Sequence, residues 1–547
     1  MRPTIYITFV LSVLLFSCQS KVDTPKTESH LENNLLIQGS FFQGANGIFF
    51  DAQDRLYVAS VVSRFIGVVD TDTGAILDTL DQADGIEGPD DVTIAPDGTL
   101  YYTSILTGEV GRIAPDGSSK KQFVSPGVNP VTLSDEGRLF VALDFQGDGL
   151  YELDPNLEKE PRLIIKELGW LNAFDFGPDG YLYGPIWSKG QIVKIDVDKG
   201  ELEVVIDDLQ TPAAVKFNSK GELFAIDHKT GIVYQIDLDN HTKKEIASGF
   251  IGADNIAFNS KDDLYLANAQ DGSILEVMMH GSKRIVIPPS LCNAGDVEYV
   301  DGKLLAADLL SLKSISPSNG SIQHTWHHMI GVSGIVGPFT IDHESGKLAM
   351  TSWFGNEVQV WDIAKDEAIT TSHDYAVPIN AILDNGSLIV AELGTTPGAA
   401  KVSRKIDDDH EVLMDASKGL IVPSGLAASD GAIYVADYYT GTIYQLTESG
   451  KLIDTPKAIV TELVQPEGLQ VGPDGRLYIV ETGKNVIRAF DLSTGEHEVV
   501  VDSVNLGVSG PAGMPPTWKL SDVHFDGEGS IFVTSDVDNT VLKYDLE

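Results

Sequence analysis

The chain has 547 residues, and its 42% hydrophobic content, 53 glycines and 25 prolines exclude a disordered protein and indicate a turn-rich globular one. Its 38 basic and 80 acidic residues give a net charge of −42, which excludes nucleic acid and anionic membrane surfaces as expected partners. The length exceeds what one ordinary hydrophobic core supports, so we expect at least two domains.

The first residues predict an export signal. Arg2 precedes an apolar stretch over residues 5–16 that is too short to span a membrane comfortably. Leu15-Phe16-Ser17-Cys18 resembles a bacterial lipobox, in which cleavage before the cysteine leaves it lipidated; the alternative is a plain signal peptide with an incidental cysteine. We expect a signal peptide over 1–17, a lipidated Cys18 with a polar tether over 18–33, and a lipid-anchored protein of the bacterial cell envelope.

The two cysteines predict no disulfide bond. Once Cys18 is lipidated, Cys292 is the only cysteine of the mature chain. Its apolar neighbour Leu291 predicts a small buried residue rather than a reactive thiol.

A motif recurs about twelve times along the rest of the chain. Each copy runs from a small polar cluster through alternating apolar residues to a Gly or Asp turn and a second apolar strand, as in residues 89–101. The turn residues are Asp54, Gly98, Gly137, Gly180, Gly221, Asp262, Gly302, Gly346, Gly386, Gly431, Gly475 and Gly529. Their spacings of 39 to 54 residues are typical of four-stranded propeller blades.

Twelve blades in one ring would leave a wide, empty centre, so the fold class that we expect is all-β, with two tandem six-bladed β-propellers. Residues 35–37 precede the first unit and residues 284–287 precede the seventh, and each segment is placed to close its own ring as an outer strand. This gives a first propeller over 34–280 and a second over 281–547. In the competing arrangement both chain ends close one ring, and strands are exchanged between the rings.

The innermost strand of a blade begins at the mouth of the central channel, so the residues eight positions before each turn converge there. In the first half these are Asn46, Asp90, Asn129, Asn172, Ala213 and Asp254. Five of the six carry carboxylate or amide oxygens, the hard donors that Ca²⁺ requires, and none is the thiolate or imidazole that zinc or copper favours. Asn46, Asp90, Asn129, Asn172 and Asp254 are therefore candidate calcium ligands.

The second half serves as an internal control. Asn and Asp also occur before strands because they satisfy local backbone groups, and a polar ring can simply line a wet channel. The equivalent residues of the second half are Ala294, Pro338, Pro378, Pro423, Glu467 and Ser521. Turn chemistry alone would fill both rings alike, so the difference favours a functional site in the first ring.

Four segments of the first half resemble the SMP-30, gluconolactonase and paraoxonase group of six-bladed, calcium-dependent lactonases and esterases. They are Ala45-Asn46-Gly47-Ile48, Pro89-Asp90-Asp91-Val92, Leu171-Asn172-Ala173-Phe174 and Ala253-Asp254-Asn255-Ile256. The resemblance implies one calcium ion at the channel mouth and hydrolysis of a small-molecule lactone or ester. It also implies that Asp90 and Asp254 take part in catalysis, with Asp254 as the base that activates water.

The chain departs from that group in two ways. In that group the acid at this position is commonly Glu, whereas this chain has Asp90, whose side chain is one methylene shorter. No paired histidine of the paraoxonase kind is evident, and His228 is expected to be a surface or blade residue. Asp91 is the second candidate for the base, although its position one residue after Asp90 also fits a contact between blades.

Other clusters of residues have a structural explanation as well as a functional one. His327 and His328 precede the second blade of the second ring, and we expect them in lid packing or an interface rather than as metal ligands. A second oxygen site of the second ring would use Asp296, Asn380, Glu467 and Asp522. Aromatic residues near the first ring's mouth either wall a pocket for an apolar or aromatic lactone or pack between blades: Phe42, Trp170 and Trp187.

Two other functions compete with a calcium-dependent hydrolase. A non-enzymatic, NHL-like scaffold would bind a protein or glycan, with the second propeller as the place for a protein partner; residues 434–438 and 477–482 fit NHL-like repeats equally well. A lyase like the streptogramin-opening propellers is suggested by Pro466-Glu467-Gly468, but its general-base histidine is not identifiable. In all three cases the membrane is expected as a partner only through the lipid anchor.

Overall fold

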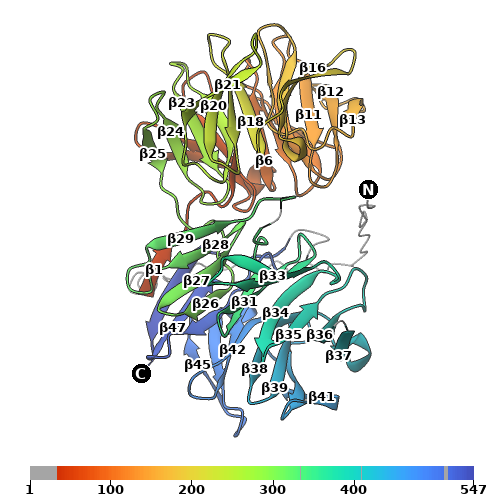
Figure 1. The fold of residues 1–547 in the computed structure, drawn as a ribbon, viewed down its shortest axis with the longest axis vertical. Helices are drawn as coiled ribbons and strands as arrows, with labels where there is room; N and C mark the ends of the chain where they lie inside the picture. The colour runs from red at the N-terminus through yellow and green to blue at the C-terminus, as the bar shows by residue number, and fades with distance from the viewer. Residues whose placement is uncertain (1–33, 333, 408, 511–514, 547) are drawn as a thin grey trace. The chain divides into compact units, whose positions relative to one another are not determined.

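The computed structural model describes residues 34–332, 334–407, 409–510 and 515–546 (Figure 1). The predicted signal peptide, Cys18 and the tether lie outside the described residues. Twelve four-stranded antiparallel sheets account for the fold, together with short 3-10 turns, which confirms the predicted all-β class. Among the described residues no helix is long and apolar enough to cross a membrane.

The first ring consists of six sheets, each built from four consecutive strands. Its strands are β2 (Ala45–Phe50), β3 (Leu56–Ser60), β4 (Phe65–Val69), β5 (Ile76–Leu80), β6 (Pro89–Ile94), β7 (Leu100–Ser104), β8 (Glu109–Ile113), β9 (Ser119–Phe123), β10 (Val128–Leu133), β11 (Leu139–Leu143), β12 (Gly149–Leu153), β13 (Arg162–Lys166), β14 (Asp175–Phe176), β15 (Leu182–Ile186), β16 (Gln191–Asp196), β17 (Glu201–Ile206), β18 (Pro212–Phe217), β19 (Leu223–Asp227), β20 (Ile232–Asp237), β21 (Thr242–Ala247), β22 (Ala253–Phe258), β23 (Leu264–Asn268), β24 (Ile274–Val277) and β25 (Lys283–Ile287). Its 3-10 turns are η1 (Gln82–Asp84) and η2 (Trp187–Lys189).

The second ring also has six sheets, and the last of them takes its outer strand from the other end of the described chain. Its strands are β26 (Val297–Val300), β27 (Lys303–Asp308), β28 (Ser311–Ile315), β29 (Ile322–His327), β30 (Thr340–Glu344), β31 (Lys347–Ser352), β32 (Glu357–Asp362), β33 (Glu367–Ser372), β34 (Pro378–Asp384), β35 (Ser387–Glu392), β36 (Lys401–Ile406), β37 (Asp409–Asp415), β38 (Pro423–Ser429), β39 (Ala432–Asp437), β40 (Thr442–Glu448), β41 (Lys451–Val460), β42 (Pro466–Val471), β43 (Leu477–Glu481), β44 (Val486–Phe490), β45 (His497–Val501), β46 (Val523–Phe525), β47 (Ser530–Ser535), β48 (Thr540–Asp545) and β1 (Leu35–Gln38). Its 3-10 turns are η3 (Ala416–Lys418) and η4 (Thr482–Lys484).

The repeat turns make hairpins by a local mechanism. Between β6 and β7, the Asp97 carboxylate accepts the Thr99 N–H at 2.9 Å, and the Gly98 N–H donates to the Ala95 carbonyl. Gly98 has φ +87, a left-handed value that glycine adopts without a side-chain clash. Each motif copy therefore reverses the chain at the same point, which sets the register of the first two strands in every blade.

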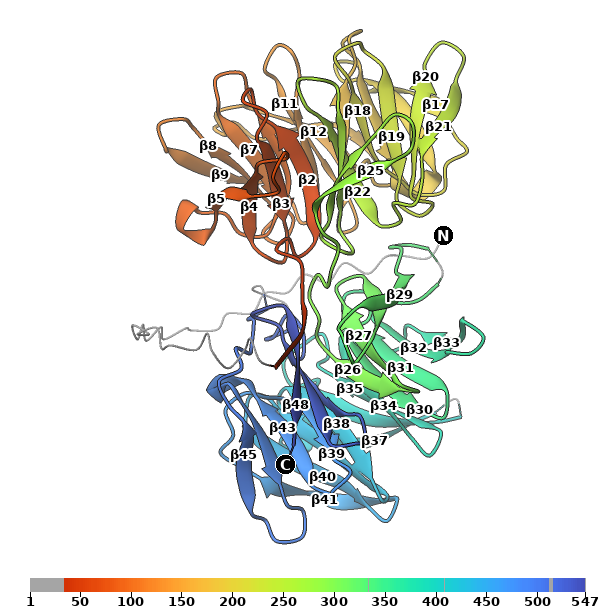
Figure 2. The same cartoon turned by 90° about the vertical axis from the view of Figure 1, so that its left-hand side faces the viewer.

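The first strand of each sheet is innermost, because the first strands contact one another around a closed circuit. In the first ring β2 contacts both β6 and β22, and β2 and β22 lie side by side in Figure 2. The gradient of burial follows this order: β6 is almost wholly buried, whereas the polar β9 of the same sheet is mostly exposed. Residues at the start of the first strands therefore meet at one end of the channel.

The predicted ring closure was wrong, and the competing arrangement is the one observed. β25 pairs with β24 and completes the sixth sheet of the first ring, with Ile274 opposite Ile287. β1 instead pairs with β48, with Gln38 opposite Thr540, and completes the last sheet of the second ring. The short turn after β24 brings β25 back as its neighbour, while β48 ends the last hairpin with an unpaired edge that β1 covers.

The compact units follow from this pairing. One comprises Ser40–Cys292, and the other comprises Asn293–Glu547 with the segment that ends at Gly39. These bounds differ from the predicted 34–280 and 281–547 because β1 and β25 belong to the opposite rings from those expected.

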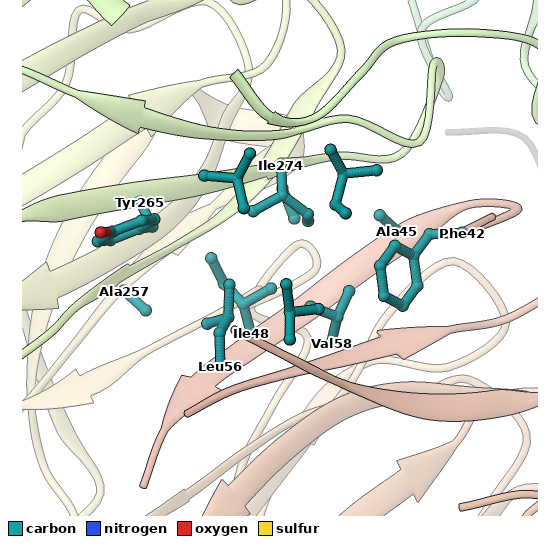
Figure 3. Packing of buried hydrophobic residues seen from close by; sticks show 12 residues of the cluster. Phe42, Ala45, Ile48, Leu56, Val58, Ala257, Tyr265 and Ile274 are labelled. Carbon is teal, nitrogen blue, oxygen red and sulfur yellow. The ribbon is translucent and has the colours of Figure 1, made fainter. Parts of the chain in front are cut away.

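Among the described residues no strand is shared between the first and sixth sheets of the first ring, so side-chain packing and hydrogen bonds close it, among them the bond from Arg284 Nη1 to the Thr71 carbonyl at 2.7 Å and that from the Ser260 N–H to Asp54 at 2.8 Å. Figure 3 shows the buried cluster at this junction. Phe42, Ile48 and Val58 come from the first sheet and its entry, and Tyr265 and Ile274 come from the sixth. Buried apolar surface is thus one contribution to the closure of the first ring.

Candidate functional site

The six predicted mouth residues of the first ring occupy equivalent places. Five of them are the second residue of an innermost strand, and Asn172 lies just after the isolated bridge of Leu171 with Ile186. Ala213 has no polar side chain, Asn46 is half-buried, and the other four are buried: Asp90, Asn129, Asn172 and Asp254. Because the innermost strands form a closed circuit, these side chains lie at one end of one channel.

Two asparagine–aspartate pairs organise this mouth. Asn46 Nδ2 donates to Asp90 Oδ1 at 2.9 Å between the first and second sheets. Asn129 Nδ2 donates to Asp144 Oδ2 at 3.0 Å within the third. In each pair the second carboxylate oxygen, Asp90 Oδ2 or Asp144 Oδ1, is buried without a hydrogen-bond partner among the described residues. Asn172 uses its amide oxygen locally, accepting the Ala173 N–H at 2.8 Å.

His228 directly follows β19 and is buried beside Asp254, so it is a blade residue and not a surface residue. Its Nδ1 lies 3.5 Å from Asp254 Oδ1 and 3.0 Å from the Ala253 carbonyl oxygen. Gln270 Nε2 lies 3.2 Å from His228 Nε2. An amide nitrogen only donates, so this assignment makes Nε2 the acceptor and leaves Nδ1 as the donor toward the Ala253 carbonyl.

Burial and mutual repulsion disfavour ionisation of the mouth carboxyls. Burial raises the pKa of Asp90 well above its usual value, with further contributions from Asp254 and Asp91. The pKa of Asp144 is also raised well above its usual value, by burial first and then by Asp90 and Asp254. The pKa of Asp254 rises to about 7 through burial and then Asp91.

No positive side chain balances these three carboxyls. Within the described part of the chain, neither lysine nor arginine lies at ion-pair distance from Asp90, Asp144 or Asp254. The mouth therefore holds three buried carboxyls whose ionised form a bound cation would stabilise.

Asp91 belongs to the contact between blades. Its Oδ1 accepts the Val92 N–H and its Oδ2 accepts the Val131 N–H of the next sheet, each at 2.9 Å. Burial raises the pKa of Asp91 to about 6. Asp175 makes the same kind of bond to the Phe217 N–H at 3.0 Å. Both oxygens of Asp91 are thus engaged by the backbone.

Two site residues, Asp144 and His228, escaped the sequence reasoning although they share a simple signal. Each is the residue directly after the second strand of its blade, and Trp187 holds the same place in the blade between them. The Trp187 and His228 rings are 5.0 Å apart. Scanning the position after the second strand, in addition to the start of the first, would have found all three.

Two residues proposed for a second oxygen site, Asp296 and Glu467, each bond the backbone of the next sheet with one oxygen, while Asp296 Oδ1 and Glu467 Oε1 are buried without a hydrogen-bond partner among the described residues. Asp296 Oδ2 accepts the Ile341 N–H at 2.9 Å, and Glu467 Oε2 accepts the Ser521 N–H at 2.8 Å, each reaching the next sheet. Burial raises the pKa of Asp296, and the nearby Asp522 carboxyl raises it further. The structure gives Asn380 no contact that joins it to them.

The second ring instead carries a positive group, Lys519, two residues before its mouth residue Ser521. Lys519 is 3% exposed, and its Nζ donates to the Pro338 carbonyl at 2.6 Å and the Asp308 carbonyl at 3.1 Å. Pro338 occupies the place that Asp90 has in the first ring. Burial lowers the pKa of Lys519 to about 8.

His327 and His328 are both partly buried. His328 Nδ1 lies 2.8 Å from the Ile335 carbonyl oxygen. Burial lowers the pKa of His327 to about 4 and also lowers that of His328. Both therefore favour the neutral form that packing requires.

Two negative findings bound the site. Among the described residues, no three His, Cys, Asp or Glu side chains form a preassembled metal centre. A groove of about 600 Å³ lies between the first and sixth sheets of the first ring, lined by residues such as Arg55, Asp72 and Arg284, and it includes none of the mouth residues.

Comparisons with known proteins give limited similarity. Residues 75–113 match the model of the family "Strictosidine synthase-like, N-terminal", a β-propeller family. The chain is 27% identical over 174 residues to Protein SUPPRESSOR OF QUENCHING 1, chloroplastic, of Arabidopsis thaliana; the match covers 29% of this chain and 15% of that protein.

Among solved structures, the extracellular domain of a one-component system of B. thetaiotaomicron is 10% identical, with a TM-score of 0.33, over 94% of this chain and 77% of that one. The extracellular domain of a hybrid two-component system of the same organism is 12% identical, with a TM-score of 0.33, over 93% of this chain and 77% of that one.

Proposed function

We propose that the first ring is a calcium-dependent hydrolase of a lactone or ester, as the resemblance to the SMP-30 group implies. The observation that carries the proposal is the pair of buried carboxylate oxygens, Asp90 Oδ2 and Asp144 Oδ1, that have no donor in a mouth with no lysine or arginine partner. Unpaired buried carboxylates are costly, and a bound cation removes that cost. The match to the strictosidine synthase-like model includes Asp90 and so overlaps the site.

The residues present fit Ca²⁺ better than a transition metal. Ca²⁺ takes six to eight oxygens, including carboxylates, amide carbonyls and water, so it does not need three acidic side chains already gathered around one point. Asp90, Asp144 and Asp254 would supply the charge, and Asn46, Asn129 and Asn172 neutral oxygens. Asp144 joins the predicted ligands because Asn129 holds it at the mouth. When bound, Ca²⁺ would polarise the substrate carbonyl and stabilise the developing oxyanion.

The side chains of the mouth have separate roles in the proposed hydrolysis. Asp254, once ionised, accepts the proton of the attacking water. His228 holds Asp254 from one side, and Gln270 fixes the imidazole so that its Nδ1–H faces the Ala253 carbonyl rather than the channel. Asn46 orients Asp90 through the 2.9 Å bond to its Oδ1, which leaves Oδ2 for the cation.

The cellular setting is part of the same proposal. The lipobox-like Leu15-Phe16-Ser17-Cys18 supports an envelope protein anchored by a lipid on Cys18, with the polar segment after it as a tether. The strongly acidic composition supports a small-molecule substrate over nucleic acid.

Calorimetric calcium titration of residues 19–547 tests the metal site without a guess about substrate. We expect saturable binding that Asp254→Ala weakens at least tenfold. A lactone and ester panel, followed by release of acid, then tests hydrolysis in the wild type and in the same variant. Calcium indifference in both proteins would contradict the proposal and favour the NHL-like scaffold, in which Asp90 and Asp254 can be changed without loss of function.

A further inference from the structure

The groove of about 600 Å³ between the first and sixth sheets lies at the end of the first ring away from the mouth. Its lining includes Asp54, in the turn after β2, and Lys261, in the turn after β22, whereas Asn46 and Asp254 stand at the start of these two strands. A strand of six residues is about 20 Å long, so the groove is separate from the oxygen site. All of its lining belongs to the unit Ser40–Cys292.

The third sheet shows what fills the equivalent place at its junction with the fourth. Arg138 directly precedes β11, and its guanidinium donates to both oxygens of Glu152, at 2.7 and 3.0 Å. Its Nη2 also lies 2.9 Å from Asp198 Oδ1 of the fourth sheet, and its guanidinium carbon lies 5.1 Å from the centre of the Phe140 ring. One guanidinium thus occupies the space between two sheets, held by two carboxylates and an aromatic ring.

The junction of the sixth sheet with the first has the same two carboxylates and an aromatic ring. The residues in the places of Glu152, Asp198 and Phe140, by strand register and turn position, are Glu276, Asp72 and Tyr265. All three line the groove, and Figure 3 shows Tyr265 at this junction. Asp263 directly precedes β23, in the place of Arg138, and also lines the groove. The groove is therefore the space that an arginine side chain fills in the third sheet.

The outer strands confirm that the two junctions are equivalent. In the third sheet Arg162, on β13, donates to the Val197 carbonyl of the next sheet at 3.3 Å. In the sixth sheet Arg284, on β25, donates to the Thr71 carbonyl of the first sheet at 2.7 Å. The two junctions thus differ at the residue before the second strand, which is arginine in the third sheet and aspartate in the sixth.

The charges of the groove favour a cation. Its lining includes five carboxylates and three basic side chains. Arg55 is paired with Asp51, and Arg284 contacts Glu276 through Oε2 alone. Glu276 is 8% exposed, and its Oε1 remains available to another donor, whereas both oxygens of Glu152 receive a guanidinium. A second guanidinium would complete the arrangement that the third sheet has with its own side chains.

We propose that this groove binds a small guanidinium compound, which takes the place that Arg138 has at the other junction. The guanidinium donates to Glu276 Oε1 and to the Asp72 carboxylate and lies against the Tyr265 ring. The planar fork of a guanidinium matches two carboxylates and an aromatic face better than a compact ammonium does. The volume of the groove is in the range of small-molecule sites. The inference does not depend on calcium or on hydrolysis, because the groove shares no residue with the mouth.

Calorimetric titration of residues 19–547 with agmatine tests the site. Agmatine carries a guanidinium and an ammonium, and 1,5-diaminopentane has the same charge at similar length without the guanidinium. In about 0.15 M salt, which screens diffuse attraction by the acidic surface, we expect one agmatine per chain and at least about fivefold weaker binding of the diamine. Asp263→Arg installs the side chain of the third sheet and should abolish this binding, while the Tm and the calcium affinity are kept.

Matched variants at the two junctions provide the controls. Asp72 is exposed, so Asp72→Asn should weaken agmatine binding at least about fivefold without a change in Tm. Asp198→Asn removes the equivalent carboxylate where Arg138 already fills the space, and it should leave agmatine binding unchanged. Arg138→Ala should instead add a second agmatine per chain.

Four results would overturn the inference: equal agmatine binding by the wild type and Asp263→Arg, equal affinity for the diamine, equal losses in Asp72→Asn and Asp198→Asn, or no second agmatine in Arg138→Ala. If Asp263→Arg does not fold, the comparison of Asp72→Asn with Asp198→Asn decides.

Discussion

Asn129 holds Asp144 through a 3.0 Å hydrogen bond from Nδ2 to Oδ2, and the other oxygen of Asp144 is buried without a donor among the described residues. This pair resembles the bond from Asn46 to Asp90, so the same amide–carboxylate unit occurs twice at one channel mouth. Each unit fixes a carboxylate and leaves one oxygen directed to no protein donor. The mouth therefore combines fixed carboxyl groups with carboxyl oxygens that have no hydrogen-bond partner among the described residues.

Asp144→Asn should stabilise the protein without calcium and weaken calcium binding. The change removes a carboxyl whose pKa is raised by burial and by the neighbouring Asp90 and Asp254, so we expect a Tm higher by a few degrees in EDTA. Loss of one charged ligand should weaken calcium affinity at least tenfold, or about 1.4 kcal/mol. Thermal unfolding with and without calcium, together with calorimetry, checks both signs. A lower Tm in EDTA and an unchanged calcium affinity would show that Asp144 is structural.

The stability of the calcium-free protein should fall as the pH rises from about 4 to 7. Burial raises the pKa of Asp254 to about 7, above its unfolded value, so the folded state binds more protons than the unfolded state in this window. The stabilisation is complete below the unfolded pKa and is lost as the pH rises through the folded pKa. For three pH units it is on the order of 4 kcal/mol.

Asp254→Asn is the control for this pH dependence. Its amide does not titrate, so denaturant unfolding in EDTA at pH 4 to 8 should show a smaller loss than in the wild type. Calcium binding to the wild type near pH 6.5 should also release protons, which calorimetry in buffers of different ionisation enthalpy measures. Identical pH profiles for the two proteins would contradict the assignment.

His228→Phe should reduce turnover while leaving calcium affinity within about twofold. Phenylalanine keeps the ring contact with Trp187 and loses the nitrogen that lies 3.5 Å from Asp254. We expect kcat to fall about tenfold, with a shifted pH profile, because Asp254 loses the group that positions it. Gln270→Leu, which removes only the partner of the imidazole, should reproduce a smaller part of the effect. Equal loss of calcium binding in both variants would indicate general damage to the mouth.

Lys519→Ala should destabilise the second ring and leave calcium binding unchanged. It removes the donor from two buried carbonyls, those of Asp308 and Pro338, at a cost of about 1–3 kcal/mol each. Methylammonium should restore part of the Tm, because it replaces the lost ammonium in the cavity, whereas methanol should not. Equal effects of methylammonium and methanol would show that the positive charge is unimportant.

Residues 40–292 should fold alone and keep the calcium site. All four strands of each of their six sheets are consecutive, and the site uses no residue outside this range. Deletion of residues 34–38 should instead destabilise the second ring, because β48 loses its partner β1. Circular dichroism and cooperative thermal unfolding of the fragment, and Tm of the deletion variant, test these opposite expectations. An unfolded 40–292 fragment would mean that the first ring depends on the rest of the chain.

The sequence by itself determined the blades, because each blade is encoded locally: alternating apolar residues make the strands, and turns such as Asp97-Gly98 fix their register. The same repeat placed Asn46, Asp90, Asn129, Asn172 and Asp254 at equivalent positions, since the register of the first strand is counted from its turn. Counting from the turns does not say which sheet a strand joins, and the tertiary structure decided that. Whether β1 completes the first or the second ring depends on which sheet edge is left unpaired, an effect between segments about 500 residues apart.

The same reason explains the incomplete prediction of the site. Asp144 and His228 follow second strands, and they reach the mouth only when neighbouring blades pack around the channel. Asp91 and Asp254 both begin innermost strands, but the backbone of the next blade engages Asp91, while Asp254 faces His228. Local propensity fixed which residues begin each strand, and packing between blades decided which of their oxygens remain unpaired.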